Sequence, residues 1–138
     1  MITICSPFAT QTMQPNVVKV LSACVTALRE KKAQNIVVLD VREWSPITSY
    51  MVIAEGTVDR HVQALARQVL DECHELQLPK TYVEGMQEGA WVVVDLDEVM
   101  VHLFIPEWRQ HYALEQLWPD AQLIPTKSLE RPLQAAGD

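Results

Sequence analysis

The sequence predicts a single α/β domain of the α+β type, in which helices flank a mixed five-stranded sheet. Three observations predict this class. The chain has 138 residues and a hydrophobic content of 49%, enough to fill one core. Two long segments repeat apolar residues at helical spacing. Around them lie short apolar or alternating segments separated by turn-forming residues, which is the pattern of strands.

The two long segments predict the main helices. We expect the first over residues 16–32, where Asn16 can cap the amino end. The second is expected over residues 57–76, with Thr57 as its cap. Its apolar residues give the strongest helical signal in the chain. They are Val58, Val62, Leu65, Ala66, Val69, Leu70, Cys73 and Leu76.

The short segments predict five strands followed by two short helices. The strands are expected at residues 35–41, 49–54, 81–84, 90–95 and 99–105. Short turns between neighbouring strands favour antiparallel pairs, whereas the long second helix allows a parallel crossover. Pro106 suits the first turn of a helix that runs to about Tyr112, and another short helix is expected near residues 114–117.

The ends of the chain carry weaker patterns than its middle. We expect residues 16–121 to form the domain, residues 1–15 a loose extension and residues 122–138 a flexible tail. The amino end lacks the basic cluster and apolar stretch of a secretory signal. No apolar run has the roughly 18 to 20 residues that a membrane span needs. Three widely spaced cysteines favour a reducing compartment, so the expected location is cytoplasmic.

The net charge of −7 is confined to one stretch, residues 84–120. This stretch holds eight acidic residues and a single basic one, Arg109, so it carries the whole imbalance. Such a surface would repel nucleic acid, which is bound through Lys and Arg. It would attract a basic protein and speed the encounter. The alternative is that the acidic surface only keeps the protein soluble.

Enzymatic signals are weak. Asp95 and Asp97 flank one residue, and two carboxylates so placed can hold magnesium in a nucleotidyl-transferring enzyme. Those enzymes also need a flexible Gly-Ser loop for the phosphates, and the chain has no Gly-Ser pair. Acidic residues are equally typical of a hairpin turn. The four histidines have no zinc-site spacing, so we expect no metal, no cofactor and no catalytic residue.

Aromatic residues gather in the same acidic stretch. Trp91, Trp108, Tyr112 and Trp118 all lie between residues 84 and 120. Trp and Tyr are frequent hot spots of protein interfaces, because they bury a large area and keep one polar group to bond. Each can equally be an ordinary core residue, since Trp is highly buried on average. Their coincidence with the negative charge favours an interface.

Three motifs, taken in order, resemble those of the Iojap-like ribosomal silencing factors. The first joins Leu39-Asp40-Val41 to the strand 50–54 and to Gly56-Thr57-Val58-Asp59-Arg60-His61-Val62. The second is Glu84-Gly85, followed by Gly89-Ala90-Trp91-Val92-Val93-Val94-Asp95. The third is the run 99–104, followed by Glu107, Arg109, Tyr112, Leu114-Glu115 and Leu117-Trp118. The resemblance covers roughly residues 16–121. One departure is Ser49, where the family usually has Asp.

The resemblance implies a nucleotidyltransferase-like fold without the catalytic site. It implies a translational repressor that binds protein fourteen of the large ribosomal subunit (uL-fourteen) and blocks joining of the small subunit when nutrients are scarce. Family members can also form homodimers. Carried onto this sequence, the expected partner-binding residues are Glu84, Trp91, Glu107, Arg109, Tyr112, Glu115, Trp118 and Asp120.

Two other hypotheses remain open at this stage. One is a divergent magnesium-dependent nucleotidyltransferase that uses Asp95 and Asp97, and it rests on fold analogy alone. The other is a homodimeric scaffold with an unrelated basic partner. No direct reading of nucleic acid and no membrane association is expected.

Overall fold

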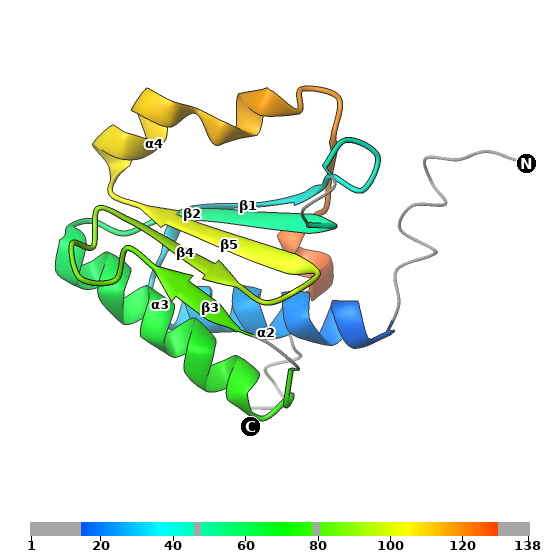
Figure 1. Cartoon of the computed structure of the whole chain (residues 1–138), viewed down its shortest axis with the longest axis horizontal. Coiled ribbons are helices and arrows are strands. Elements are labelled where there is room, and N and C mark those ends of the chain that lie inside the picture. The colour runs from blue at the N-terminus through cyan, green and yellow to red at the C-terminus, as the bar shows by residue number, and fades with distance from the viewer. Residues whose placement is uncertain (1–14, 46–47, 79–80, 130–138) are drawn as a thin grey trace, which may run out of the picture.

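The computed structural model describes residues 15–45, 48–78 and 81–129. In these residues, two long helices cover one face of a six-stranded sheet, and the short helical segments between residues 106 and 117 lie over the other (Figure 1). The long helices are α2 (Pro15–Glu30) and α3 (Asp59–His74). The strands are β1 (Gln34–Asp40), β2 (Tyr50–Glu55), β3 (Tyr82–Glu84), β4 (Trp91–Asp95), β5 (Val99–Phe104) and β6 (Gln122–Leu123). The short segments are α4 (Pro106–Tyr112), η1 (Leu114–Leu117) and η2 (Thr126–Leu129).

The sheet is mixed, as the sequence predicts, with the strand order β3-β4-β5-β2-β1-β6. The central strands β2 and β5 are parallel, and the other neighbouring pairs are antiparallel. The chain leaves β2 through α3, forms the hairpin of β3 and β4, and returns as β5. This order places β3, β4 and β5 together on one side of the sheet.

The main core lies between the sheet and the two long helices. Leu21 and Leu28 of α2 and Leu65 of α3 are fully buried in it. From the sheet, β5 contributes Val101 and Leu103, which alternate with residues of the opposite face. Burial of a side chain of this size contributes about 1.5–3 kcal/mol to the free energy of unfolding. Both helices bury the apolar stripes that their helical periodicity predicts.

The amino end of α3 is held by His61, whereas the sequence predicts a Thr57 side-chain cap. The N-cap position is Val58, which makes no side-chain cap hydrogen bond. The backbone N–H of Thr57 donates to Nδ1 of His61 at 2.9 Å, and Nε2 of His61 donates to the carbonyl of Lys31 at 2.7 Å. His61 thus joins the start of α3 to the residue after α2. The first helix also begins one residue before Asn16, at a proline that suits a first turn.

A second, smaller core lies on the other face of the sheet. It consists of Leu39, Val41, Met51, Ile53 and Phe104. Trp118 and Ala121 pack against it from the segment that follows η1, and Trp91 packs against its β4 side. The chain after α4 therefore covers the β1 and β2 part of this face.

Residues 122–129 belong to the folded domain, so the predicted tail is wrong for this segment. Strand β6 pairs antiparallel with β1 and makes the sheet six-stranded instead of five-stranded. Ile124 and Leu129 are buried in the main core. A strand of two residues is too short to show a period, which is why the sequence pattern does not reveal it.

Residues 1–14 and 130–138 lie outside the described residues, so the extension and the end of the tail remain predictions. Within the described ranges, none of the helices combines the length and the apolarity needed to cross a membrane.

Candidate partner-binding surface

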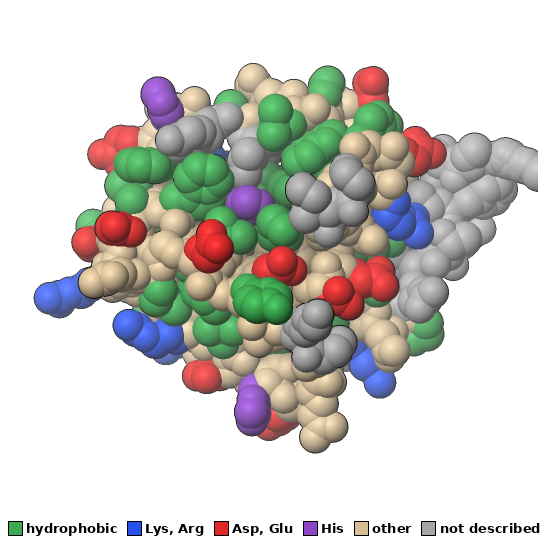
Figure 2. All heavy atoms as spheres, in the orientation of Figure 1, with side chains coloured by type: hydrophobic (Ala, Val, Ile, Leu, Met, Phe, Trp, Pro, Cys, Tyr) green, Lys and Arg blue, Asp and Glu red, His purple; other side chains and the backbone are tan. Residues whose placement is uncertain are grey.

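Strands β3, β4 and β5 present side chains to solvent on the second sheet face. On β3, β4 and β5, alternate side chains point away from α2 and α3, because the residues between them pack into the main core. The outward set is Tyr82, Glu84, Trp91, Val93, Asp95, Met100 and His102, which we call the β3–β5 face. All of these except His102 are at least partly exposed. Figure 2 shows hydrophobic and acidic side chains intermixed on the visible side of the molecule, with Lys and Arg toward its margins.

Trp91 is the anchored aromatic of this face. Its indole Nε1 donates a hydrogen bond to Nδ1 of His102 at 3.1 Å. Its ring lies 5.0 Å from the ring of Phe104, between centroids, and 6.0 Å from that of His102. The three side chains come from the paired strands β4 and β5, where Trp91 lies opposite Phe104. The half-buried indole is therefore fixed in one orientation, with part of its surface facing solvent.

His102 is the uncharged hydrogen-bond acceptor that holds the Trp91 indole. Burial lowers the pKa of His102 to about 4, so the ring is uncharged at neutral pH. A neutral ring whose Nδ1 accepts from Trp91 carries its proton on Nε2. That Nε2 is buried and has no hydrogen-bond partner among the described residues.

The turn before Trp91 is fixed by two contacts. Gly85 has a φ of +83°, and a Cβ there would lie 2.1 Å from the carbonyl oxygen of Trp91, so only glycine fits. From α3, the side-chain amide of Gln63 donates to the carbonyls of Met86 and Gln87 at 2.9 and 3.2 Å. Helix α3 thus sets the position of the β3–β4 turn and, through it, that of Trp91.

Arg109 is a buried structural residue of α4. Its side chain is 9% exposed, and Nη1 donates to Glu55 Oε2 at 3.1 Å and to the carbonyl of Asn35 at 2.6 Å. These bonds tie α4 to β1 and β2. Glu55 lies outside residues 84–120. Arg109, the single basic residue of the acidic stretch, is therefore neutralised inside the fold by a carboxylate from another part of the chain. The charges that this stretch presents to solvent are therefore acidic.

Of the other predicted site residues, the structure places Glu84 on this face, and it places Glu107, Trp118 and Asp120 on α4 or in the segment after η1. Glu84 is exposed on β3, next to the strand of Trp91. Glu107 on α4 and Asp120 after η1 are exposed, and Trp118 is half-buried on the second core. Trp91 and Trp118 thus both pack against the same small core. Tyr112 and Glu115 lie in α4 and η1, but their side chains fall outside what the structure describes.

Sequence reasoning missed Tyr82. It is one of the most exposed large hydrophobic residues, at 61%, and it shares the β3–β5 face with Glu84. Its register partner on β4 is Asp95, so an aromatic and an acidic side chain lie side by side. The alternation Tyr82-Val83-Glu84, with Val83 facing the core, is the signal that would have found it.

The carboxylate pair serves the β4–β5 turn. The backbone N–H of Asp97 donates to Oδ1 of Asp95 at 3.0 Å, and Asp97 has a φ of +77°. This is an Asx turn, which uses the Asp95 side chain locally. Across residues 15–45, 48–78 and 81–129, no group of three or more His, Cys, Asp or Glu residues is arranged to hold a metal ion.

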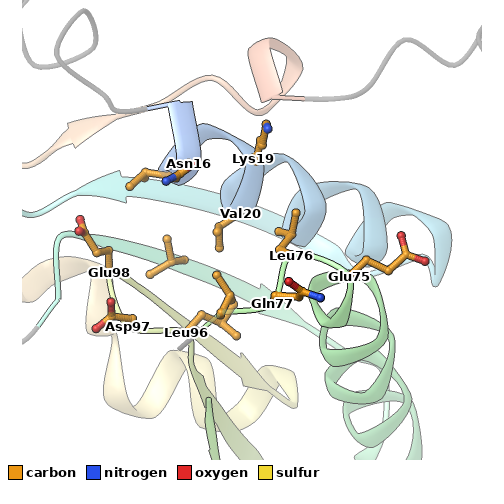
Figure 3. Close-up of a pocket in the computed structure, with 12 residues that line it drawn as sticks. Asn16, Lys19, Val20, Glu75, Leu76, Gln77, Leu96, Asp97 and Glu98 are labelled. Atoms are coloured by element: carbon orange, nitrogen blue, oxygen red, sulfur yellow. The ribbon is translucent and has the colours of Figure 1, made fainter. Parts of the chain in front are cut away.

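A pocket of about 510 Å³ lies beside this turn, between the start of α2 and the end of α3 (Figure 3). Glu75, Asp97 and Glu98 line it together with a single cation, Lys19. Three carboxylates around one lysine disfavour the phosphates of a nucleotide. Asp97 lines this pocket and Asp95 does not, so the two carboxylates do not converge there.

Comparison with known proteins decides the family. The family model described as "Ribosomal silencing factor during starvation" matches residues 14–137. The chain belongs to the ribosomal silencing factor family. It is 38% identical to the ribosomal silencing factor RsfS of Bacillus subtilis over 104 residues, which cover 75% of this chain and 88% of that one.

Two further comparisons extend this result. The chain is 34% identical to the mouse protein named "Mitochondrial assembly of ribosomal large subunit protein 1" over 97 residues, 68% of this chain and 42% of that protein. A crystal structure of a protein from Chromobacterium violaceum matches with a TM-score of 0.71 at 30% identity, covering 78% of this chain and 88% of that chain. The predicted α+β class and the family resemblance are both confirmed. The description of the family, a factor that silences the ribosome during starvation, is that of a regulatory protein.

Proposed function

We propose that this silencing factor docks on the large ribosomal subunit through protein fourteen of that subunit, and that the docked domain blocks the small subunit when nutrients are scarce. The observation that carries the proposal is Trp91, an aromatic side chain held rigidly on an open, acidic sheet face. The names of the relatives support the ribosome as target, and the mouse relative is named for the large subunit.

The chemistry of the β3–β5 face favours a basic protein over RNA. The acidic stretch has no solvent-facing base to meet phosphates, because Arg109 is bonded to Glu55 inside the fold. Trp91 and Tyr82 offer the large aromatic surface on which interface energy concentrates. Acidic side chains around them would attract a positively charged partner and favour its correct orientation.

Silencing of this kind requires only that the protein occupies its binding site on the large subunit. No chemical reaction is needed. A standard interface buries roughly 800 Å² on each partner. The chain exposes 8003 Å², so such an interface would use a small part of its surface. The bound domain then fills space that the small subunit requires. This protein and the small subunit compete for free large subunits, so the degree of silencing follows from mass action.

The predicted site residues take different parts in this proposal. Trp91 and Glu84 make direct contact, while Arg109 acts indirectly by fixing α4 on the sheet. The exposed acids Glu107 and Asp120 extend the contact along α4 and the segment after η1. Trp118, with Tyr112 and Glu115, completes the proposed surface on that side.

Two further parts of the proposal concern the free protein. Its target places it in the cytoplasm. Off the ribosome, the apolar residues of the same surface would be free to pair two copies of the chain as a homodimer.

Sedimentation with separated ribosomal subunits tests the proposal. The tagged chain is expected to move with large subunits and not with small ones. Its addition before mixing is expected to reduce the fraction of joined ribosomes. Movement with neither subunit, or normal joining at saturating protein, would contradict the proposed function.

A further inference from the structure

The pocket of about 510 Å³ beside the β4–β5 turn lies apart from the proposed docking contact. It is formed by the start of α2, the end of α3 and the turn between β4 and β5 (Figure 3). Trp91 begins β4, whereas this turn follows the other end of that strand. A ligand in the pocket would therefore leave Trp91 accessible to a partner.

The floor of the pocket is apolar. Val20 of α2, Leu96 of the turn and Val99 of β5 line it and are 6%, 2% and 1% exposed. Leu76 and Leu78, which follow α3, are half-buried and complete the lining on that side. The volume is within the range of sites that bind small molecules, about 300–1,000 Å³. An aliphatic chain on this floor would be removed from water, which favours binding.

Carboxylates lie at opposite ends of this floor. Glu75, at the end of α3, lies at one end, and Asp97 and Glu98 of the β4–β5 turn lie at the other (Figure 3). None of these three forms an ion pair within the ranges that the structure describes. Lys19 also lines the pocket, but its ammonium group extends away from Leu96 (Figure 3). The pocket therefore presents negative charge at both ends.

This arrangement suits neither an anion nor a metal ion. The carboxylates repel phosphates and other anions. A magnesium or calcium ion needs about six or more oxygen ligands that converge on one point. Carboxylates at opposite ends do not converge, and the described part of the chain contains no group of three or more His, Cys, Asp or Glu residues placed to hold a metal. An organic cation with an apolar middle matches the pocket better.

We propose that this pocket binds a linear aliphatic polyamine. One ammonium group lies near Glu75 and another near Asp97 and Glu98, and the methylene chain between them lies on Val20 and Leu96. Burial of the methylenes and the ion pairs at the two ends both contribute to the affinity. The bound amine contacts α2, the end of α3 and the β4–β5 turn together, so it stabilises the folded chain by mass action.

Titration of the full-length chain with spermidine tests the proposal. Calorimetry measures the stoichiometry and the Kd, and methyl NMR spectra report which side chains meet the ligand. We expect one saturable site, shifts of the methyl signals of Val20, Leu96 and Val99, and a Tm that rises with spermidine concentration. Butylamine, which has a single ammonium group, is expected to bind about tenfold more weakly. Magnesium at equal charge concentration should not compete for the site.

Two matched double variants separate the pocket from general negative charge. Glu75→Gln with Asp97→Asn neutralises one carboxylate at each end, and Asn tolerates the positive φ of residue 97. This variant is expected to bind spermidine about tenfold more weakly than the natural chain. Glu43→Gln with Glu88→Gln removes the same charge at exposed positions outside the pocket and should bind as the natural chain does. Circular dichroism confirms that both variants are folded.

Three results would overturn the proposal. They are the absence of saturable spermidine binding, methyl shifts confined to residues outside the pocket, and equal weakening in the two double variants. Equal competition by magnesium would also count against it, because it would show that spermidine acts only as a counterion. None of these measurements involves the ribosome, so their failure is distinct from failure of the proposed docking.

Discussion

The indole nitrogen of Trp91 donates to Nδ1 of His102 at 3.1 Å, so the half-buried aromatic of β4 is held by a buried neutral base of β5. The two residues lie diagonally across paired strands, and His102 is directly opposite Val93. This bond requires an unprotonated Nδ1. The orientation of Trp91 and the stability of the fold in acid are therefore linked through one side chain.

The first prediction concerns pH. The pKa of His102 is lowered from 6.5 to about 4 by burial, so between these values the unfolded chain binds a proton that the folded chain does not. The free energy of unfolding should therefore fall as the pH decreases through this window. From about pH 7 to about pH 5 the loss from this residue is roughly 2 kcal/mol. Urea titrations at both pH values measure it.

The control for this prediction is His102→Gln, which can still accept from Trp91 but does not titrate. It should lose less stability than the natural chain over the same pH interval. Equal losses in the two proteins would show that His102 is not the group responsible.

The second prediction concerns the buried ion pair. Arg109→Met leaves the largely buried Glu55 carboxylate, whose side chain is 12% exposed, without its cation. Loss of one partner of a buried pair costs about 3–5 kcal/mol. The double variant Arg109→Met with Glu55→Gln should recover much of this loss, because it removes the stranded charge. Urea unfolding of all four members of the cycle measures the coupling, and additive losses would contradict the account.

The third prediction concerns Gly85. Alanine at this position would combine a positive φ with a Cβ 2.1 Å from the Trp91 carbonyl. Strain of this kind costs about 1–3 kcal/mol and would move the start of β4. We expect Gly85→Ala to lower the Tm and to weaken binding to large subunits. Glu88→Ala, an exposed change in the same turn, is the matched control and should do neither.

The fourth prediction concerns steering by charge. Glu84→Lys combined with Glu107→Lys should slow association with large subunits, because it reverses two exposed charges near the proposed contact. The difference should shrink as salt rises, since the Debye length falls to about 8 Å at physiological ionic strength. Asp71→Lys on the exposed side of α3 provides the control. Rates that are unchanged at low salt would mean that the acidic field does not steer this encounter.

Periodicity is what made the fold predictable. The stripes of α2 and α3 and the alternation of β5 each repeat over several residues, so their direction and buried faces follow from the sequence. Strand β6 has two residues and no such repeat. The role of His61 at the start of α3 also escaped prediction, because its partner Lys31 lies thirty residues away.

The candidate site was predictable only in part. The confinement of charge to residues 84–120 can be counted from the sequence, and it located the acidic surface. Which side chains reach that surface depends on strand pairing. Arg109 turns inward to Glu55 and Asn35, and Tyr82 turns outward from a three-residue strand. Neither orientation can be read from residue type.

The most direct test of the central claim is the affinity of Trp91→Ala for large ribosomal subunits, compared with that of Trp44→Ala. Trp44 is also exposed, at 43%, but it lies on the connection after β1 and outside the β3–β5 face. Loss of an interface hot spot costs about 2 kcal/mol or more, so the Kd of Trp91→Ala should rise by at least about thirtyfold. Trp44→Ala should bind as the natural chain does. Equal affinity of a folded Trp91→Ala variant and the natural chain would contradict docking through this face.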